Sequence, residues 1–173
     1  VLTSNGVGAA PTFQAAAGGG FTLGTEQDVT GAGPYTFSSI PAGTTMIVIS
    51  LYGVSVSGTT SITIEIGDVG GIESSGYTGE CQDVVTDATA SNSSHFKLTD
   101  LSDPGSVYNG HVRLALEDSS GFTWVATSQI GNNGGGEAQM MHGVKSLSAE
   151  LTQLRIANAN GFDASGVVNI MYQ

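Results

Sequence analysis

Acidic side chains gather in one glycine-punctuated segment, residues 67–93, and these are the groups in the sequence best placed to do chemistry. The segment contains one tyrosine and five carboxylates: Asp68, Glu73, Tyr77, Glu80, Asp83 and Asp87. Two carboxylates could act as acid and base in glycoside hydrolysis, or several could hold a calcium ion. The D-x-D-x-D-G order of a calcium hand is missing, so an irregular calcium site is only an alternative to a solvated acidic loop. We predict no metal and no other cofactor.

The standard signatures of enzymes are missing from the sequence. It has no G-x-S-x-G nucleophile elbow, no phosphate-binding G-x-x-x-x-G-K and no H-E-x-x-H zinc motif. Cys81 is the one cysteine, so no disulfide forms within the chain. A thiol nucleophile needs a base beside it, and no spacing links Cys81 to its possible partner His95. We therefore predict that the chain is not an enzyme.

The other two histidines are expected to have different environments. His111 falls on the polar side of an alternating segment, which predicts that it faces solvent. His142 shares its side of the next such segment with Met140 and Val144, which predicts a partly buried, hydrogen-bonded imidazole and not a metal ligand.

The charge of the chain restricts its partners. Four lysine and arginine residues stand against 15 aspartate and glutamate residues, for a net charge of −11. A nucleic-acid interface needs a basic patch, and docking to an anionic membrane needs one too, so we predict neither partner. An anionic polysaccharide would also be repelled unless a divalent cation bridged it. No apolar run reaches the length of a membrane-spanning helix, so no membrane insertion is expected.

Hydrophobic residues repeat with period two, which predicts an all-β chain. The run 44–54 is expected to be buried on both faces and to form a hairpin with 61–66. A second hairpin is expected to pair 110–117 with 122–128, burying Trp124. Further strands are expected at 138–147, 151–156 and 167–172. This pattern predicts one antiparallel β-sandwich of jelly-roll type over residues 21–173.

Three segments, 67–93, 99–107 and 130–137, are predicted to be long loops, and receptor contact is expected chiefly from 67–93 and 130–137. Glycine, asparagine and tyrosine on loops supply shape, amide hydrogen bonds and a stacking face, which suit neutral sugars or protein loops. Trp124, Tyr77 and Tyr35 are the candidate stacking rings, although Trp124 fits the core better. We assign receptor contact to the following residues: Tyr77, Glu80, Asp83, Asn132 and Asn133.

Residues 1–14 read V-L-T-S-N-G-V-G-A-A-P-T-F-Q, and they resemble a linker of bacteriophage tail-fibre and other virion appendage proteins. The stretches 37–43, 64–68, 71–77 and 166–171 also resemble β-sandwich domains of that family. The resemblance implies a short extended linker at 1–20, anchored by Phe13, that follows an upstream shaft. It also implies a homotrimeric receptor-binding tip on the exterior of the virion that attaches the particle to a host cell-surface glycan or protein. The start at Val1, which is not a methionine, fits a piece of a longer fibre.

Two other classes stay open. A secreted carbohydrate-binding module would be monomeric and would lack a shaft. A polysaccharide depolymerase would release reducing sugar, but the long β-helices typical of such enzymes have internal repeats, and none is visible here.

Overall fold

The computed structural model describes residues 2–3, 12–13, 19–134 and 136–173, and these residues form strands and no helix. None of them therefore belongs to a helix long and apolar enough to cross a membrane. The strands are β1 (Leu2–Thr3), β2 (Thr12–Phe13), β3 (Thr22–Leu23), β4 (Gln27–Gly31), β5 (Tyr35–Phe37), β6 (Met46–Val54), β7 (Thr63–Asp68), β8 (Gly71–Ile72), β9 (Tyr77–Asp83), β10 (Thr89–Ser91), β11 (Phe96–Lys97), β12 (Tyr108–Asp118), β13 (Thr123–Asn132), β14 (Ala138–Ser146), β15 (Gln153–Ala157) and β16 (Phe162–Tyr172).

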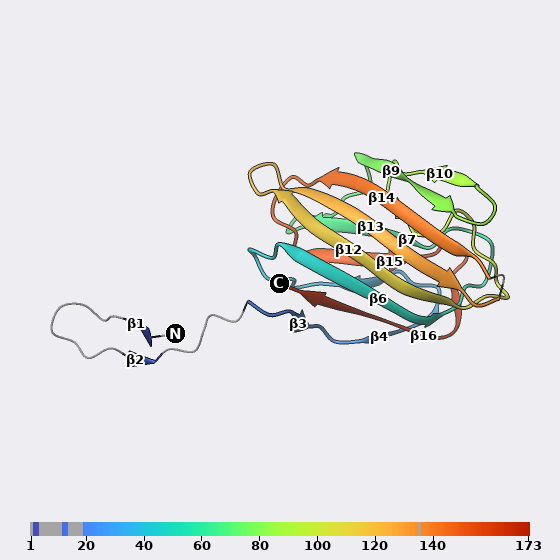
Figure 1. The fold of residues 1–173 in the computed structure, drawn as a ribbon, viewed down its shortest axis with the longest axis horizontal. Helices are drawn as coiled ribbons and strands as arrows, with labels where there is room; N and C mark the ends of the chain where they lie inside the picture. Colours follow the sequence, from blue (N-terminus) through green and yellow to red (C-terminus); the bar gives the residue numbers. More distant parts are fainter. Residues whose placement is uncertain (1, 4–11, 14–18, 135) are drawn as a thin grey trace.

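Two antiparallel sheets pack face to face (Figure 1). The large sheet has the order β10-β9-β14-β13-β12-β6-β16-β3, with β4 also paired to β16. The small sheet has the order β11-β7-β15-β5, with β8 paired to β7. The predicted antiparallel β-sandwich is thus confirmed. Jelly-roll connectivity is not confirmed, because β12, β13 and β14 are consecutive neighbours in one sheet, which is a meander.

One predicted hairpin is present and the other is wrong. β12 and β13 pair along their whole length around the turn at Asp118–Gly121. β6 and β7, in contrast, lie in different sheets, and the chain between them crosses the sandwich, with Val56 bridging to Phe162. Alternation identifies a strand but does not say which strand is its neighbour.

The core fills the space between the sheets with large apolar side chains. Trp124, Tyr108, Phe96 and Phe162 are all fully buried, which confirms the prediction for Trp124. Close packing also explains a glycine on β14: a Cβ on Gly143 would lie 2.9 Å from the ring of Phe96. The glycine therefore lets the small sheet's Phe96 ring lie directly on the large sheet.

A charged pair joins the inner side of β14 to the segment that follows β8, with Lys145 buried and Glu73 partly buried. The Lys145 ammonium contacts a carboxylate oxygen of Glu73, donates to the carbonyl oxygen of Ser146 at 2.6 Å and lies 5.6 Å from the centre of the Tyr77 ring. The other oxygen of Glu73 accepts the backbone N–H of Ser148. Burial alone would raise the pKa of Glu73, but the hydrogen bonds from Lys145 and Ser148 lower it below the ordinary value.

Different parts of the chain lie at the two ends of the sandwich. At one end Gly19 accepts a hydrogen bond from the side chain of Gln173, so the start of the domain and the C-terminus lie together. The loops 84–88, 98–107 and 133–137 meet at the other end, where Val84 donates to Ala138 and Asn133 donates to Val107. Figure 1 shows this distal end on the side opposite β3 and the C-terminus.

The predicted linker, residues 1–20, is described only in part. β1 and β2 pair with each other, Leu2 opposite Phe13. The side chain of Phe13, which was predicted to anchor the linker, lies outside the described residues, as do 1, 4–11 and 14–18.

Candidate binding face

The outer side of the large sheet carries side chains in rows that follow from the strand register. In one row, from β9 to β12, stand Glu80, His142, Thr127 and Arg113. The next row, two residues along each strand, contains Gln82, Met140, Gln129 and His111. Opposite residues of neighbouring strands lie close enough for their side chains to bind one ligand together. The meander β12-β13-β14 and the pairing of β9 with β14 therefore bring these eight side chains into one surface.

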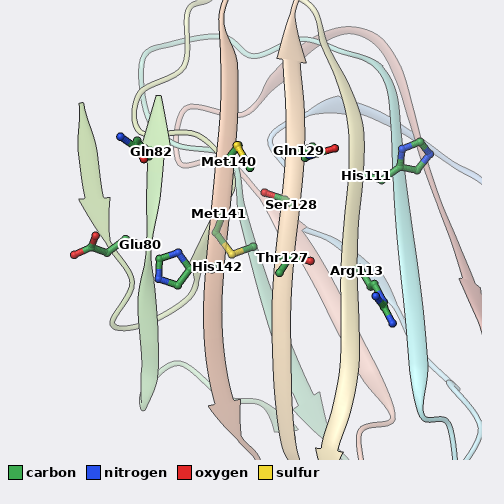
Figure 2. Close-up of a pocket in the computed structure, with 10 residues that line it drawn as sticks. All are labelled: Glu80, Gln82, His111, Arg113, Thr127, Ser128, Gln129, Met140, Met141 and His142. Atoms are coloured by element: carbon green, nitrogen blue, oxygen red, sulfur yellow. The ribbon is translucent and has the colours of Figure 1, made fainter. Parts of the chain in front are cut away.

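These two rows line a hollow of about 540 Å³ on the outer face. Figure 2 shows its ten lining residues on the four adjacent strands β9, β14, β13 and β12. We call this surface the outer face. The residues that we assign to it are Glu80, Gln82, His111, Arg113, Thr127, Gln129, Met140 and His142.

Most polar side chains on the outer face have no partner within the described part of the protein. Five exposed side chains make no hydrogen bond or ion pair with any described residue: Glu80, His111, Arg113, Gln129 and His142. Because these groups are already held on rigid strands, a ligand that binds them pays little for ordering the backbone. The outer face can thus offer carboxylate, amide, imidazole and guanidinium groups at fixed spacing.

Charge is distributed along the first row from negative to positive. Glu80 stands on β9 and Arg113 on β12, three strand spacings away, which corresponds to about 14 Å. Between them lie the uncharged hydroxyl of Thr127 and the imidazole of His142. The face therefore has no excess of one sign, and it suits a ligand rich in hydroxyl groups better than an anion or a cation.

Tyr77 does not belong to this face, and the prediction that it contacts a receptor from a loop is wrong. The segment 67–93 contains β8, β9 and β10, and Tyr77 begins β9 with its ring pointing inward, 3% exposed. Its hydroxyl accepts the N–H of Ile66 and lies 2.9 Å from the carbonyl oxygen of Glu73, and its ring packs edge-on against Phe96. Burial raises its pKa. Gly76 and Gly79 are typical of a loop in the sequence, but in the structure Gly76 comes just before β9 and Gly79 lies within it.

Asp83 and Asn132 are also buried, so their predicted role in receptor contact is wrong. Asp83 accepts the backbone N–H groups of Val85 and Thr86 and the amide of Gln139, which closes the β9–β10 turn. Burial acts to raise the pKa of Asp83, but these hydrogen bonds lower it below the ordinary value.

Asn132 shapes the distal loop from inside. It accepts the N–H of Gly134 and donates to the carboxylate of Glu137. Asn133 is exposed in that loop, and Glu80 is exposed on the outer face. Of the five residues assigned from the sequence, only Asn133 and Glu80 are therefore accessible, and they lie on different surfaces.

The prediction of a partly buried His142 is wrong as well, whereas the exposure of His111 is confirmed. On β14 the buried side chains are Gln139, Met141 and Lys145, and Met140 is 48% exposed. The outer row of β14 is the more apolar one, because the inner row pairs its polar groups with Asp83 and Glu73. Hydrophobicity alone therefore indicated the wrong side of this strand.

Tyr52 is a candidate stacking ring that the sequence analysis missed. It lies on the outer side of β6 and is 74% exposed, two residues from Ser50, which is opposite His111. Tyr35, in contrast, packs edge-on against Phe162 and bonds the carbonyl oxygen of Thr30. The prediction that the run 44–54 is buried on both faces is wrong: Ile47, Ile49 and Leu51 are buried, and the other side of β6 carries the exposed Tyr52.

Neither thiol chemistry nor a metal site is supported in the described residues. Cys81 is fully buried, and burial raises the pKa of its thiol to about 12, so the thiolate nucleophile does not form near neutral pH. No group of three or more His, Cys, Asp or Glu side chains among them is arranged to hold a metal ion.

Comparison with known proteins gave no relative: no family model matches the chain, and no significantly similar curated protein or solved structure was found.

Proposed function

We propose that this chain is a receptor-binding module that attaches a bacteriophage virion to its host, and that the outer face binds a neutral cell-surface glycan. The observation that carries the binding role is the set of exposed polar side chains, in register around the 540 Å³ hollow, that make no hydrogen bond or ion pair with the described part of the chain. Sugar hydroxyls both donate and accept hydrogen bonds, so they suit a surface that offers carboxylate, amide and imidazole groups together. The assignment to a phage fibre rests on the resemblance of residues 1–14.

An apolar component completes the proposed glycan site. The sulfur-containing side chain of Met140 lies between the two amides of Gln82 and Gln129 in its row. Tyr52 extends the same face beyond His111 with an exposed aromatic ring. Aromatic and thioether groups pack against the C–H face of a pyranose, while the neighbouring polar groups bind its hydroxyls.

We further propose that the module is a homotrimer at the end of a fibre. Gly19 lies beside the C-terminus, at the end of the sandwich opposite the distal loops, which supports an arrangement with those loops at the free end of a fibre. Three copies around an axis would also cover sheet edges that otherwise invite aggregation. Light scattering tests this directly: three chains of 17.5 kDa are expected, and a stable monomer at micromolar concentration would favour the secreted carbohydrate-binding module.

The glycan proposal is tested with an array of bacterial surface glycans and labelled protein. We expect the wild-type chain to bind at least one neutral glycan, and the double variant His111→Ala, His142→Ala to bind it at least tenfold more weakly. Both histidines are exposed, so the variant is expected to fold normally, which circular dichroism checks. Asn133→Ala is the matched control in the distal loop. If Asn133→Ala abolishes binding and the histidine variant does not, the ligand binds the distal end and the outer-face proposal is wrong.

A further inference from the structure

A second groove lies on the opposite side of the molecule, over the outer side of the small sheet. It has a volume of about 760 Å³. Strands β7, β11 and β15 form its floor, and the segments 32–34, 59–61, 100–101 and 157–159 form its walls. The outer face uses none of these residues, so the groove is separate from the glycan site proposed above.

The floor of the groove carries basic side chains, one of which is paired with a carboxylate. Two of the four lysine and arginine residues, Lys97 and Arg155, line it together with His95. The register places Lys97 opposite Thr63, and Arg155 opposite Glu65 on the same strand β7. The ammonium of Lys97 has no hydrogen-bond or ion-pair partner among the described residues.

Arg155 is fixed in place by a buried carboxylate. Its Nε donates to Glu65 at 2.5 Å, and the side chain of Glu65 is only 9% exposed. This hydrogen bond raises the pKa of Arg155. The carboxylate of Glu65 therefore neutralises the charge of Arg155. Lys97 is the cation of the groove that can bind an anion from solution.

The walls of the groove are held rigidly and add hydrogen-bonding groups. Ser61 donates to the carbonyl oxygen of Asp100 at 2.7 Å, and Thr60 donates to the side chain of Asn158 at 2.9 Å. The carboxylate of Asp100 makes no hydrogen bond or ion pair with a described residue, so it can accept from hydroxyl groups of a ligand. Beside it, Leu101 is 66% exposed and supplies an apolar surface.

We propose that this groove binds a carboxylated sugar, with the carboxylate at Lys97 and ring hydroxyls at Asp100. A simple anion would meet Asp100 as well as Lys97, so the pair favours a ligand that carries both a negative group and hydroxyl donors. The sugar's C–H face would lie against Leu101. The inference goes beyond the proposed function, because it names a different ligand class and a different surface.

Ligand-observed NMR with the whole chain tests this with glucuronic acid, glucose and acetate as probes. We expect glucuronic acid to bind at least tenfold more tightly than either glucose or acetate, because each of those lacks one of the two recognised groups. Added salt should weaken the binding of glucuronic acid and leave that of glucose unchanged.

Two variants locate the site. Lys97→Met should remove the preference for glucuronic acid, whereas Arg113→Met, which removes a cation from the outer face, should leave it unchanged. Equal binding of glucuronic acid and glucose overturns the inference, and so does equal binding of acetate. Loss of the preference in Arg113→Met but not in Lys97→Met overturns it too. The array result with His111→Ala, His142→Ala is separate from these outcomes, so the two proposals can fail independently.

Discussion

On strand β14 the inner side chains are Gln139, Met141 and Lys145, and the outer ones are Met140, His142 and Val144. The inner polar groups are tied to partners: Gln139 to Asp83, and Lys145 to Glu73. Of the outer polar groups, Ser146 shares a hydrogen bond with Thr123, whereas the imidazole of His142 has no hydrogen-bond or ion-pair partner among the described residues. The two sides of the large sheet thus differ less in polarity than in whether their polar groups are satisfied. A satisfied polar group stabilises the fold, and an unsatisfied exposed one is available to a ligand.

Two inner polar atoms depart from this rule. Ser128 Oγ and Trp124 Nε1 are buried without a hydrogen-bond partner in the described residues. Both lie on β13, facing the core.

The largest difference in stability between the two sides of the large sheet is expected when Tyr77 on the inner side and Tyr52 on the outer side are each replaced by alanine. Tyr77→Ala removes a buried ring and its hydrogen bonds, and it should lower the free energy of unfolding by roughly 3–5 kcal/mol. Tyr52→Ala removes an exposed ring of the same kind and should change it by about 0.5 kcal/mol or less. Urea denaturation of both variants measures the difference. Similar losses of stability in the two variants would contradict the assignment of Tyr52 to a ligand-binding surface.

Replacing the inner cation of the large sheet, Lys145, should also destabilise the fold more than replacing the outer one, Arg113. Lys145→Met leaves the partly buried carboxylate of Glu73 without its cation, at a cost of about 1–3 kcal/mol in unfolding free energy. Arg113→Met on the outer face breaks no ion pair and should cost about 0.5 kcal/mol or less. A Lys145→Met variant as stable as Arg113→Met would show that the ion pair between Lys145 and Glu73 does not stabilise the fold.

Acid should reduce the contribution of the Lys145–Glu73 pair to the free energy of unfolding. The pKa of Glu73 is lowered in the folded chain from its ordinary value of 4.5. Its contribution is therefore fully present above pH 4.5 and is lost as the pH falls through the lower, folded pKa. We expect the stability difference between wild type and Lys145→Met to be constant from pH 7 to pH 5 and to shrink at lower pH. A difference that does not change with acidification would mean that Glu73 is not the group involved.

The smallest effect is expected for Tyr52→Ala on binding. Loss of one stacking ring at the edge of the outer face should weaken glycan binding by about three- to tenfold, because an aromatic contact contributes roughly 0.5–1.5 kcal/mol beyond its buried area. Val69→Ala is the control, since Val69 is 87% exposed in the β7–β8 turn, away from the face. Biolayer interferometry with an array-positive glycan compares the two. If both variants bind as wild type does, Tyr52 is not part of the site.

The fold could be predicted from the sequence because alternation is a local property. The strand 110–117, its hairpin partner and the burial of Trp124 all follow from it, and all are confirmed. The pairing of β6 with β12 and β16 could not be predicted, because it joins residues far apart in the chain and depends on which strands share a sheet.

The candidate site was harder to predict, for two physical reasons. Glycines beside Tyr77 indicated a loop, whereas in the structure they border a strand whose first residue packs into the core. On β14, long-range partners such as Asp83 and Glu73 make the polar row the buried one, and no local pattern reveals those partners. Asn132 similarly resembled a recognition residue but instead shapes its own loop.

The central claim, that the outer face and not the distal loops holds the glycan, is tested most directly by backbone-amide NMR of the labelled chain during titration with an array-positive glycan. We predict that the largest shift changes fall on β9, β14, β13 and β12 around Glu80, His142, Thr127 and Arg113. Shift changes confined to residues 84–88 and 133–137, with the strand residues unmoved, would contradict the claim.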